Sequence, residues 1–105
     1  MELTVLDRLL LLSILPKEGD AISLRIVRKL REDLSFSEEE HKALGFAKTD
    51  AGLSWNPEGN IPKDISIGLK ARALVVESLE KLNKDKKLTT DFLPLYDLFV
   101  EPETN

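Results

Sequence analysis

The residues with the clearest potential for chemistry lie around His41, the only histidine among the 105 residues of the chain. Glu38 precedes it by three positions, which is the spacing of carboxylate and imidazole ligands in di-iron helical bundles. Such a centre needs two of these motifs and further glutamates, so a single chain cannot build it. His41 also falls at position N4 of a predicted helix with Phe36 at N′, the two positions of a hydrophobic staple. A structural role for His41 is therefore favoured over a catalytic or metal-binding one.

Other catalytic arrangements lack the residues that they need. The chain has no cysteine, which excludes a disulfide framework and a cysteine-ligated zinc or iron–sulfur site. It has no G-x-S-x-G sequence, and its five glycines are spread too widely to form a phosphate-binding loop. We therefore expect no catalytic residues, no metal and no cofactor, and we predict that the protein is not an enzyme.

The balance of charge points away from nucleic acid as a partner. The 15 basic and 19 acidic residues give a net charge of −4 and a pI near 5.0, whereas a dedicated nucleic-acid binder is basic. Within this acidic chain, basic residues still gather on the polar face of one predicted helix. We predict a candidate binding face from these residues, the only tryptophan and a lysine of a later helix: Arg25, Arg28, Lys29, Trp55 and Lys70.

Trp55 has two interpretations. Tryptophan is frequent at the energetic centres of interfaces, so Trp55 can be a contact for a partner. The favoured alternative is a core residue that joins a small sheet to the helices, because a Trp side chain buries a large apolar area.

Apolar periodicity together with start and stop signals predicts five helices. Thr4 with Asp7, and Ser37 with Glu40, form predicted capping boxes, and Ser23 is the predicted cap of the second helix. The predicted helices cover residues 4–15, 23–34, 38–44, 69–83 and 90–100, with Pro16 ending the first and Pro102 the last.

Between the third and fourth helices the periodicity changes from helical to alternating. Leu53 and Trp55 share one face of a short strand, Ile65 and Ile67 repeat the pattern, and a turn over residues 50–52 joins the first strand to the preceding segment. We predict a two- or three-stranded antiparallel sheet within residues 46–67 that packs on the helices. The expected fold is one compact domain over residues 1–105, of the α+β class and mainly α.

The first helix is unusually apolar. Only Asp7, Arg8 and Ser13 interrupt its surface, so we predict burial nearly all round, either in the centre of the helices or against a second copy. Its apolar run is far shorter than the ~20 residues that cross a membrane. Residues 16–18 also differ from the cleavage site of a secretory signal. We therefore expect a cytoplasmic protein without a membrane partner.

Three segments carry a resemblance to a known group of proteins: Leu9–Gly19, Leu30–Glu40 and Leu95–Val100. They resemble segments of small uncharacterised proteins encoded by bacteriophages and prophages. The shared motifs are a turn, a capping box and a terminal helix, so the resemblance implies no particular fold or activity. It implies a context instead, in which such a protein binds a host component or assembles with itself in the cytoplasm of the host cell.

Three functions stay open at this point. The leading hypothesis is a non-enzymatic interaction protein that self-associates, through the first helix or the Trp55 sheet, and binds a host protein or ligand. The second is a winged-helix DNA binder, because three helices precede a hairpin, although the glutamates at 38–40 would then face phosphates. The third is capture of a small anionic ligand such as a nucleotide between subunits by Arg25, Arg28 or Lys70.

Overall fold

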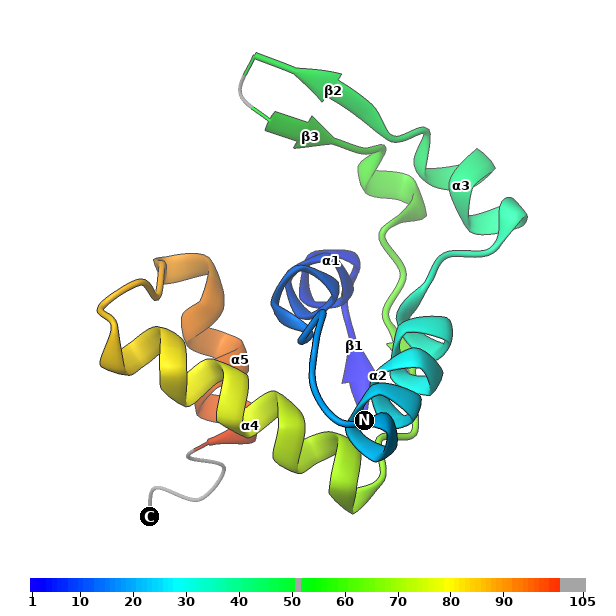
Figure 1. The fold of residues 1–105 in the computed structure, drawn as a ribbon. Helices are drawn as coiled ribbons and strands as arrows, with labels where there is room; N and C mark the ends of the chain where they lie inside the picture. Colours follow the sequence, from blue (N-terminus) through cyan, green and yellow to red (C-terminus); the bar gives the residue numbers. More distant parts are fainter. Residues whose placement is uncertain (51, 101–105) are drawn as a thin grey trace.

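The chain forms five helices and two small antiparallel sheets in the computed structural model, which describes residues 1–50 and 52–100. The helices are α1 (Val5–Ile14), α2 (Ala21–Leu34), α3 (Glu38–Leu44), α4 (Leu69–Lys84) and α5 (Leu93–Phe99), with 3-10 turns η1 (Pro57–Gly59) and η2 (Thr90–Phe92). The strands are β1 (Glu2–Leu3), β2 (Ala47–Thr49), β3 (Gly52–Ser54) and β4 (Lys63–Asp64). The predicted α+β class with mainly α content is confirmed (Figure 1).

Two helices start at their predicted capping boxes, and a third starts earlier than predicted. Thr4 and Ser37 each accept a hydrogen bond from the amide of the N3 residue and complete the predicted capping boxes. The second helix begins at Ala21, earlier than predicted, because Asp20 rather than Ser23 caps it. The Asp20 carboxylate accepts a hydrogen bond from the Ser23 amide at 2.7 Å, which makes it the acceptor for an otherwise unpaired amide of the first turn.

The last helix is shorter than predicted. The turn η2 precedes α5, so the regular helix starts at Leu93 and carries Pro94 in its first turn, where a missing N–H leaves no bond unmade. Pro102, predicted to end this helix, lies outside the described residues.

The strand pairing differs in part from the prediction. The hairpin of β2 and β3 forms between α3 and α4 as expected, with Lys48 opposite Leu53, while Ala51 of the predicted turn lies outside the described residues. The strand predicted at Ile65 and Ile67 is wrong, because the pairing falls on β4, just before them. β4 does not extend the hairpin either, since it pairs with β1 at the other end of the sequence, and Ile65 turns its side chain into the core.

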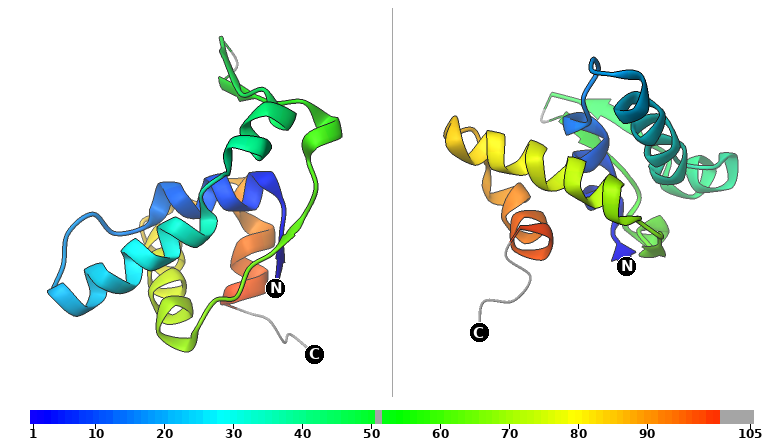
Figure 2. Two further views of the ribbon diagram at one scale, coloured as in Figure 1. Left: turned by 90° about the vertical axis from the view of Figure 1, so that its right-hand side faces the viewer. Right: turned by 60° about the horizontal axis from the view of Figure 1, so that its bottom comes forward.

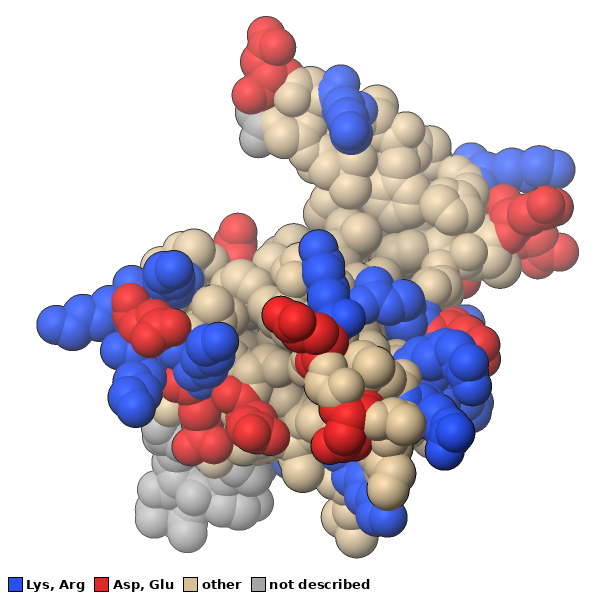
Figure 3. Space-filling view, in the orientation of Figure 1, with Lys and Arg blue, Asp and Glu red and all other residues tan. Residues whose placement is uncertain are grey.

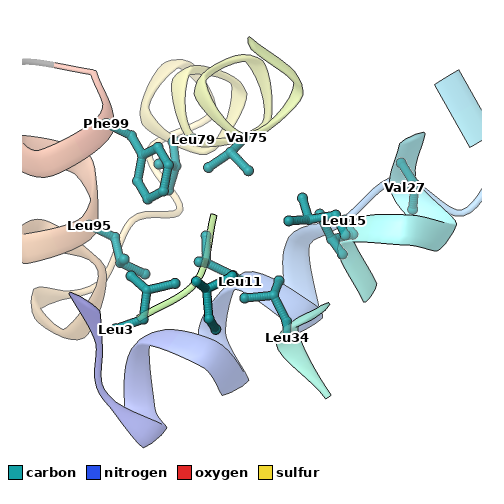
Figure 4. Close-up of a cluster of buried hydrophobic side chains, with 11 residues drawn as sticks. Leu3, Leu11, Leu15, Val27, Leu34, Val75, Leu79, Leu95 and Phe99 are labelled. Carbon is teal, nitrogen blue, oxygen red and sulfur yellow. The ribbon is translucent and has the colours of Figure 1, made fainter. Parts of the chain in front are cut away.

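The core lies around α1, which occupies the centre of the molecule between α2 and α4 (Figure 1). Of the two positions predicted for this apolar helix, the central one is therefore observed. Only Ser13 on α1 is exposed. Side chains from β1, α2, α4 and α5 meet those of α1 in one buried cluster (Figure 4): Leu3, Leu11, Leu15, Val27, Leu30, Leu34, Ile65, Val75, Leu79, Leu95 and Phe99.

Residues 36–60, which we call the arm, project away from the helices α1, α2, α4 and α5, which we call the helical body. The arm contains α3, the β2–β3 hairpin and η1, and Figures 1 and 2 show the hairpin extending beyond the body. Within the arm, β2 pairs with β3 and α3 packs against η1. The helices of the body pack little against these elements, so the position of α3 depends on the few residues that join the arm to the body.

Aromatic rings support the arm from within. The Phe36 and His41 rings lie 6.1 Å apart in an edge arrangement, so the predicted hydrophobic staple is present. Phe46 contacts both of these rings, and its centroid lies 6.1 Å from that of Trp55. Trp55 is half-buried and joins the hairpin to the α3 end of the arm through Phe46.

Gly59 permits the close approach of η1 to α3. A Cβ atom at this position would lie 2.7 Å from the Ala43 carbonyl oxygen, closer than real Cβ contacts come. The neighbouring Asn56 amide donates a hydrogen bond to the Leu44 carbonyl oxygen at 2.7 Å. The end of α3 is thus fixed by backbone contacts that only glycine at position 59 allows.

Arg8 joins the helical body to the arm, and its side chain is completely buried. Its Nε donates to the Leu34 carbonyl oxygen at 3.1 Å and its Nη2 to the Ser35 carbonyl oxygen at 2.6 Å. Its Nη1 donates to Glu40 Oε2 at 2.5 Å, and the guanidinium carbon lies 3.9 Å from the centre of the Phe36 ring. The residue that the sequence identifies only as a break in an apolar helix therefore holds the end of α2 and the start of α3 together.

Glu40 serves two partners at once. Its Oε1 accepts a hydrogen bond from the Ser37 amide at 2.9 Å in the capping box and one from Arg8 Nη2 at 3.3 Å. The hydrogen bond from Arg8 and, to a smaller extent, that from the Ser37 amide lower the pKa of Glu40 from 4.5 to about 2, against the opposing effect of burial. Among the described residues, no buried side-chain nitrogen or oxygen lacks a hydrogen-bond partner. The buried charge is therefore compensated.

Replacing Arg8 should destabilise the protein strongly. We expect Arg8→Met to lower the free energy of unfolding by roughly 3–5 kcal/mol, because Glu40 and two backbone carbonyls lose their donors. Urea unfolding followed by circular dichroism measures this loss. Arg31→Met on the exposed face of α2 is the control and should stay within about 0.5 kcal/mol of the wild type. Equal stability of the two variants would contradict the role assigned to Arg8.

The free energy of unfolding should also depend on pH through Glu40. Its pKa is lowered on folding, so its contribution is present above pH 4.5 and is lost as the pH falls toward 2. We expect this contribution to reach roughly 2–3 kcal/mol. Urea unfolding at a series of pH values should show a smaller loss across this window for Glu40→Gln than for the wild type. Glu58→Gln changes an exposed glutamate and should lose as much stability across this pH window as the wild type does. Equal losses for all three proteins would rule out the contribution of Glu40.

The close contact at Gly59 generates a third expectation. We expect Gly59→Ala to lower the free energy of unfolding by about 1–3 kcal/mol, because the added methyl group meets backbone atoms of α3 that cannot move without disturbing the helix. Gly19→Ala provides the matched control, because an added Cβ there meets nothing within 4 Å. Thermal unfolding of both variants measures the difference, and a loss at Gly19 as large as that at Gly59 would argue against the contact.

Candidate functional site

An open groove lies between α2 and the segment that runs from β4 into α4. Its volume is about 770 Å³, within the range of roughly 300–1,000 Å³ usual for ligand pockets. We call it the basic groove. It is lined by residues of α2 and of the segment 63–71: Arg25, Ile26, Lys29, Leu30, Glu32, Asp33, Lys63, Asp64, Ile65, Ser66, Gly68, Lys70 and Ala71.

Basic side chains from three elements border this groove. Arg25 and Lys29 lie one helical turn apart on α2, Lys63 comes from β4, and Lys70 from the first turn of α4. All four are exposed, and Figure 3 shows Lys and Arg side chains gathered over α2. The fold thus brings Lys70 next to residues that are far from it in the sequence.

Carboxylates of the same groove balance part of this charge. Asp33 accepts a hydrogen bond from Lys29 Nζ at 2.9 Å, and this bond, together with the attraction between the two charges, raises the pKa of Lys29. Asp64 accepts one from the amino group of Met1 at 2.7 Å. Within residues 1–50 and 52–100, Arg25 and Lys70 form no ion pair. These two cations are the ones that remain available to a ligand.

The floor of the basic groove is apolar. Leu30 and Ile65 are buried beneath it, and Ile26 and Ala71 are half-buried at its sides. A ligand that fits here would therefore contact hydrocarbon below and charge at the edge.

The N-terminus of α4 adds a favourable potential for anions. Gly68 is its N-cap residue and provides no side-chain hydrogen bond, and the first intrahelical bond runs from the Arg72 amide to the Gly68 carbonyl. The amides before Arg72 are thus unpaired within the helix, and the positive end of the helix dipole lies at the groove lined by Gly68 and Lys70.

The structure separates the five residues predicted as a binding face. Arg25, Lys29 and Lys70 line one groove, whereas Arg28 lies on α2 outside it and Trp55 belongs to the arm. Lys63 completes the basic groove and was missed, because its position depends on the pairing of β4 with β1. Two-residue strands produce no alternating pattern, so the sequence carried no signal for it.

A second groove with the opposite charge lies between α3 and residues 59–64. Its volume is about 480 Å³, and we call it the acidic groove. Glu39 and Glu40 lie on its α3 side, and Ile61 on the other side is 70% exposed. Lys63 and Asp64 of β4 line both grooves, so the two grooves adjoin along this strand.

The described residues offer no further site of the kinds considered above. In this part of the chain no group of three or more His, Cys, Asp or Glu side chains is placed to hold a metal ion. No helix among the same residues is long and apolar enough to cross a membrane. His41 is exposed on the arm, apart from both grooves.

No family model matches the chain, and neither the curated proteins nor the solved structures contain a match to it. The resemblance to phage-encoded proteins therefore stays a prediction. The functional assignment has to rest on the grooves themselves.

The winged-helix hypothesis also stays a prediction, although the charges can now be located. The order of three helices and a hairpin is present, but α3, which would read DNA, begins with the exposed Glu38 and Glu39. The exposed basic residues of α2 and α4 lie on other elements. This distribution favours the basic groove over α3 as the binding surface.

Proposed function

We propose that this is a non-catalytic binding protein that recognises an anionic partner in the basic groove. One observation carries the proposal: a single cavity gathers Arg25, Lys29, Lys63 and Lys70 over an apolar floor at the N-terminus of α4. The chemistry of these groups is that of a receptor for carboxylate or phosphate.

The available cations support recognition of an anion. Arg25 offers a planar guanidinium that can bind a carboxylate or phosphate with two parallel hydrogen bonds. Lys70 adds a second charge at the helix terminus, where the unpaired amides and the dipole favour the same sign of ligand. The groove is open to solvent, so salt should weaken the attraction.

The apolar floor restricts the class of ligand further. Further burial of the half-buried Ile26 and Ala71 at the sides of the groove stabilises the complex only if the ligand carries hydrocarbon or a flat ring beside its charge. A nucleotide and an acidic protein segment with aliphatic side chains both meet this description. An inorganic anion supplies the charge but no apolar group.

The proposed role agrees with the sequence interpretation of an interaction protein that binds a host protein or ligand. The resemblance to phage-encoded proteins supports this context, and we place the binding event in the cytoplasm, that of the host if the chain is phage-encoded. The basic groove adds two specific elements to this proposal: the surface that binds, and the negative charge expected of the partner.

Thermal unfolding with a panel of nucleotides and inorganic phosphate tests the proposal. At low micromolar protein, low salt and millimolar probe, we expect at least one nucleotide to raise Tm by about 4 °C or more, because a ligand of the native state adds stability. Arg25→Ala with Lys70→Ala should abolish the rise. Arg28→Ala is the matched control, since it removes the same charge from α2 outside the groove.

Each outcome of this experiment decides something. A rise that Arg28→Ala preserves and the double variant loses supports the basic groove as the site. A rise that all variants keep moves the site elsewhere. A synthetic peptide of residues 36–44, which carries the three glutamates of α3, serves as an additional probe for an acidic protein segment. If neither a nucleotide nor this peptide raises the Tm of the wild type, the proposed function is overturned.

A further inference from the structure

We propose that the anionic partner of the basic groove is the acidic groove of a second copy of this chain. The inference rests on the proposed function, because it assigns a partner to the same site. It describes a symmetric dimer in which each copy contributes its α3 glutamates to the basic groove of the other.

The two grooves have the placement that such a dimer requires. They adjoin along β4, whose Lys63 and Asp64 line both. The left view of Figure 2 shows α2, α3 and the segment that carries β4 on one face of the molecule. A two-fold axis that runs over β4 in the plane of the interface, parallel to this face, places each groove of one copy over the opposite groove of the other. Every contact then occurs twice, as in other two-fold interfaces.

The exposed charges on the two sides of this face are complementary. The basic groove also contains the carboxylates Glu32, Asp33 and Asp64, but its cations Arg25 and Lys70 form no ion pair among the described residues. Glu39 of the acidic groove and its neighbour Glu38 at the start of α3 form none either. Glu40 is directed inward to Arg8, which leaves Glu38 and Glu39 as the exposed carboxylates of this turn. Contact between copies would pair each free cation with a carboxylate and orient the two copies.

An exposed apolar residue lies where the interface needs one. Ile61 borders the acidic groove with 70% of its surface exposed, and the floor of the basic groove is apolar. In the symmetric arrangement, Ile61 of one copy covers Ile26 and Ala71 of the other. Leu69, which is 87% exposed beside Gly68, lies at the edge of the same contact. Both exposed side chains would leave water on association.

This interface differs from the self-association surfaces suggested by the sequence. α1 is covered by α2 and α4, and Trp55 is packed against Phe46 within the arm. Both grooves, by contrast, are open to solvent.

Sedimentation equilibrium with charge reversal tests the dimer. We expect the wild type to dimerise at low salt, and two variants to be at least ten-fold weaker in self-association: Glu38→Lys with Glu39→Lys, and Arg25→Glu with Lys70→Glu. Mixing the two variants should restore association, because opposite charges then face each other in the mixed dimer. Glu77→Lys with Glu80→Lys, on the exposed side of α4, is the matched control and should dimerise like the wild type.

Loss of folding must not be mistaken for loss of the interface. Circular dichroism of each variant checks this, and Glu38→Gln with Glu39→Gln provides a milder substitution in the first turn of α3, where reversed charge opposes the helix dipole. Restored association in the mixture excludes misfolding directly, since misfolded variants do not rescue each other.

The outcomes separate this inference from the proposed function. A wild type that stays monomeric at hundreds of micromolar overturns the dimer, and nucleotide binding lost with Arg25 and Lys70 would leave the proposed function intact. A dimer that ignores both charge reversals also overturns the interface. Dimerisation that both variants lose and their mixture restores supports the inference, and a probe nucleotide that dissociates this dimer identifies the basic groove as the shared site.

Discussion

The structure depends on one buried cation. Arg8 lies at the end of the first turn of an apolar helix and is fully buried, and a buried charge is tolerated only when each donor has an acceptor. The acceptors are the carbonyls at the end of α2 and the carboxylate at the start of α3, with the Phe36 ring against the guanidinium. Removing the charge from water therefore requires these groups to converge, and their convergence sets the angle at which α3 leaves the body.

Both grooves follow from this geometry. α2 forms one side of the basic groove, α3 forms one side of the acidic groove, and β4 lies between them. The guanidinium that joins α2 to α3 therefore also fixes how far apart the two grooves lie and which way they face. Lys63 strengthens the relation, since its Nζ lies 3.9 Å from the Glu40 carboxylate. The ion pair between Arg8 and Glu40 thus supports the surface proposed for recognition, and Glu40 itself lines the acidic groove.

Local signals in the sequence predicted what is local in the fold. The capping boxes at Thr4 and Ser37 and the position of Pro94 follow from hydrogen bonds within a few residues, and so does the placement of Arg25 beside Lys29 on α2. The basic groove could be predicted only in part, because Lys63 reaches it through the pairing of two very short strands. The burial of Arg8 could not be predicted, because its acceptors belong to the end of α2 and the start of α3 and no pattern near Arg8 in the sequence indicates them.

The pairing of β1 with β4 has a consequence for the order of folding. It joins residues 3 and 63, so it closes a loop of about 60 residues, and the entropy of that closure must be offset by contacts that the helices make first. Helices form quickly, whereas closing a loop of this length is slower, so we expect this pairing to follow the formation of α1 and α2. Lys63 would take its place in the grooves at that step. A chain without this pairing would lack one side of both grooves, so the proposed recognition requires the completed topology.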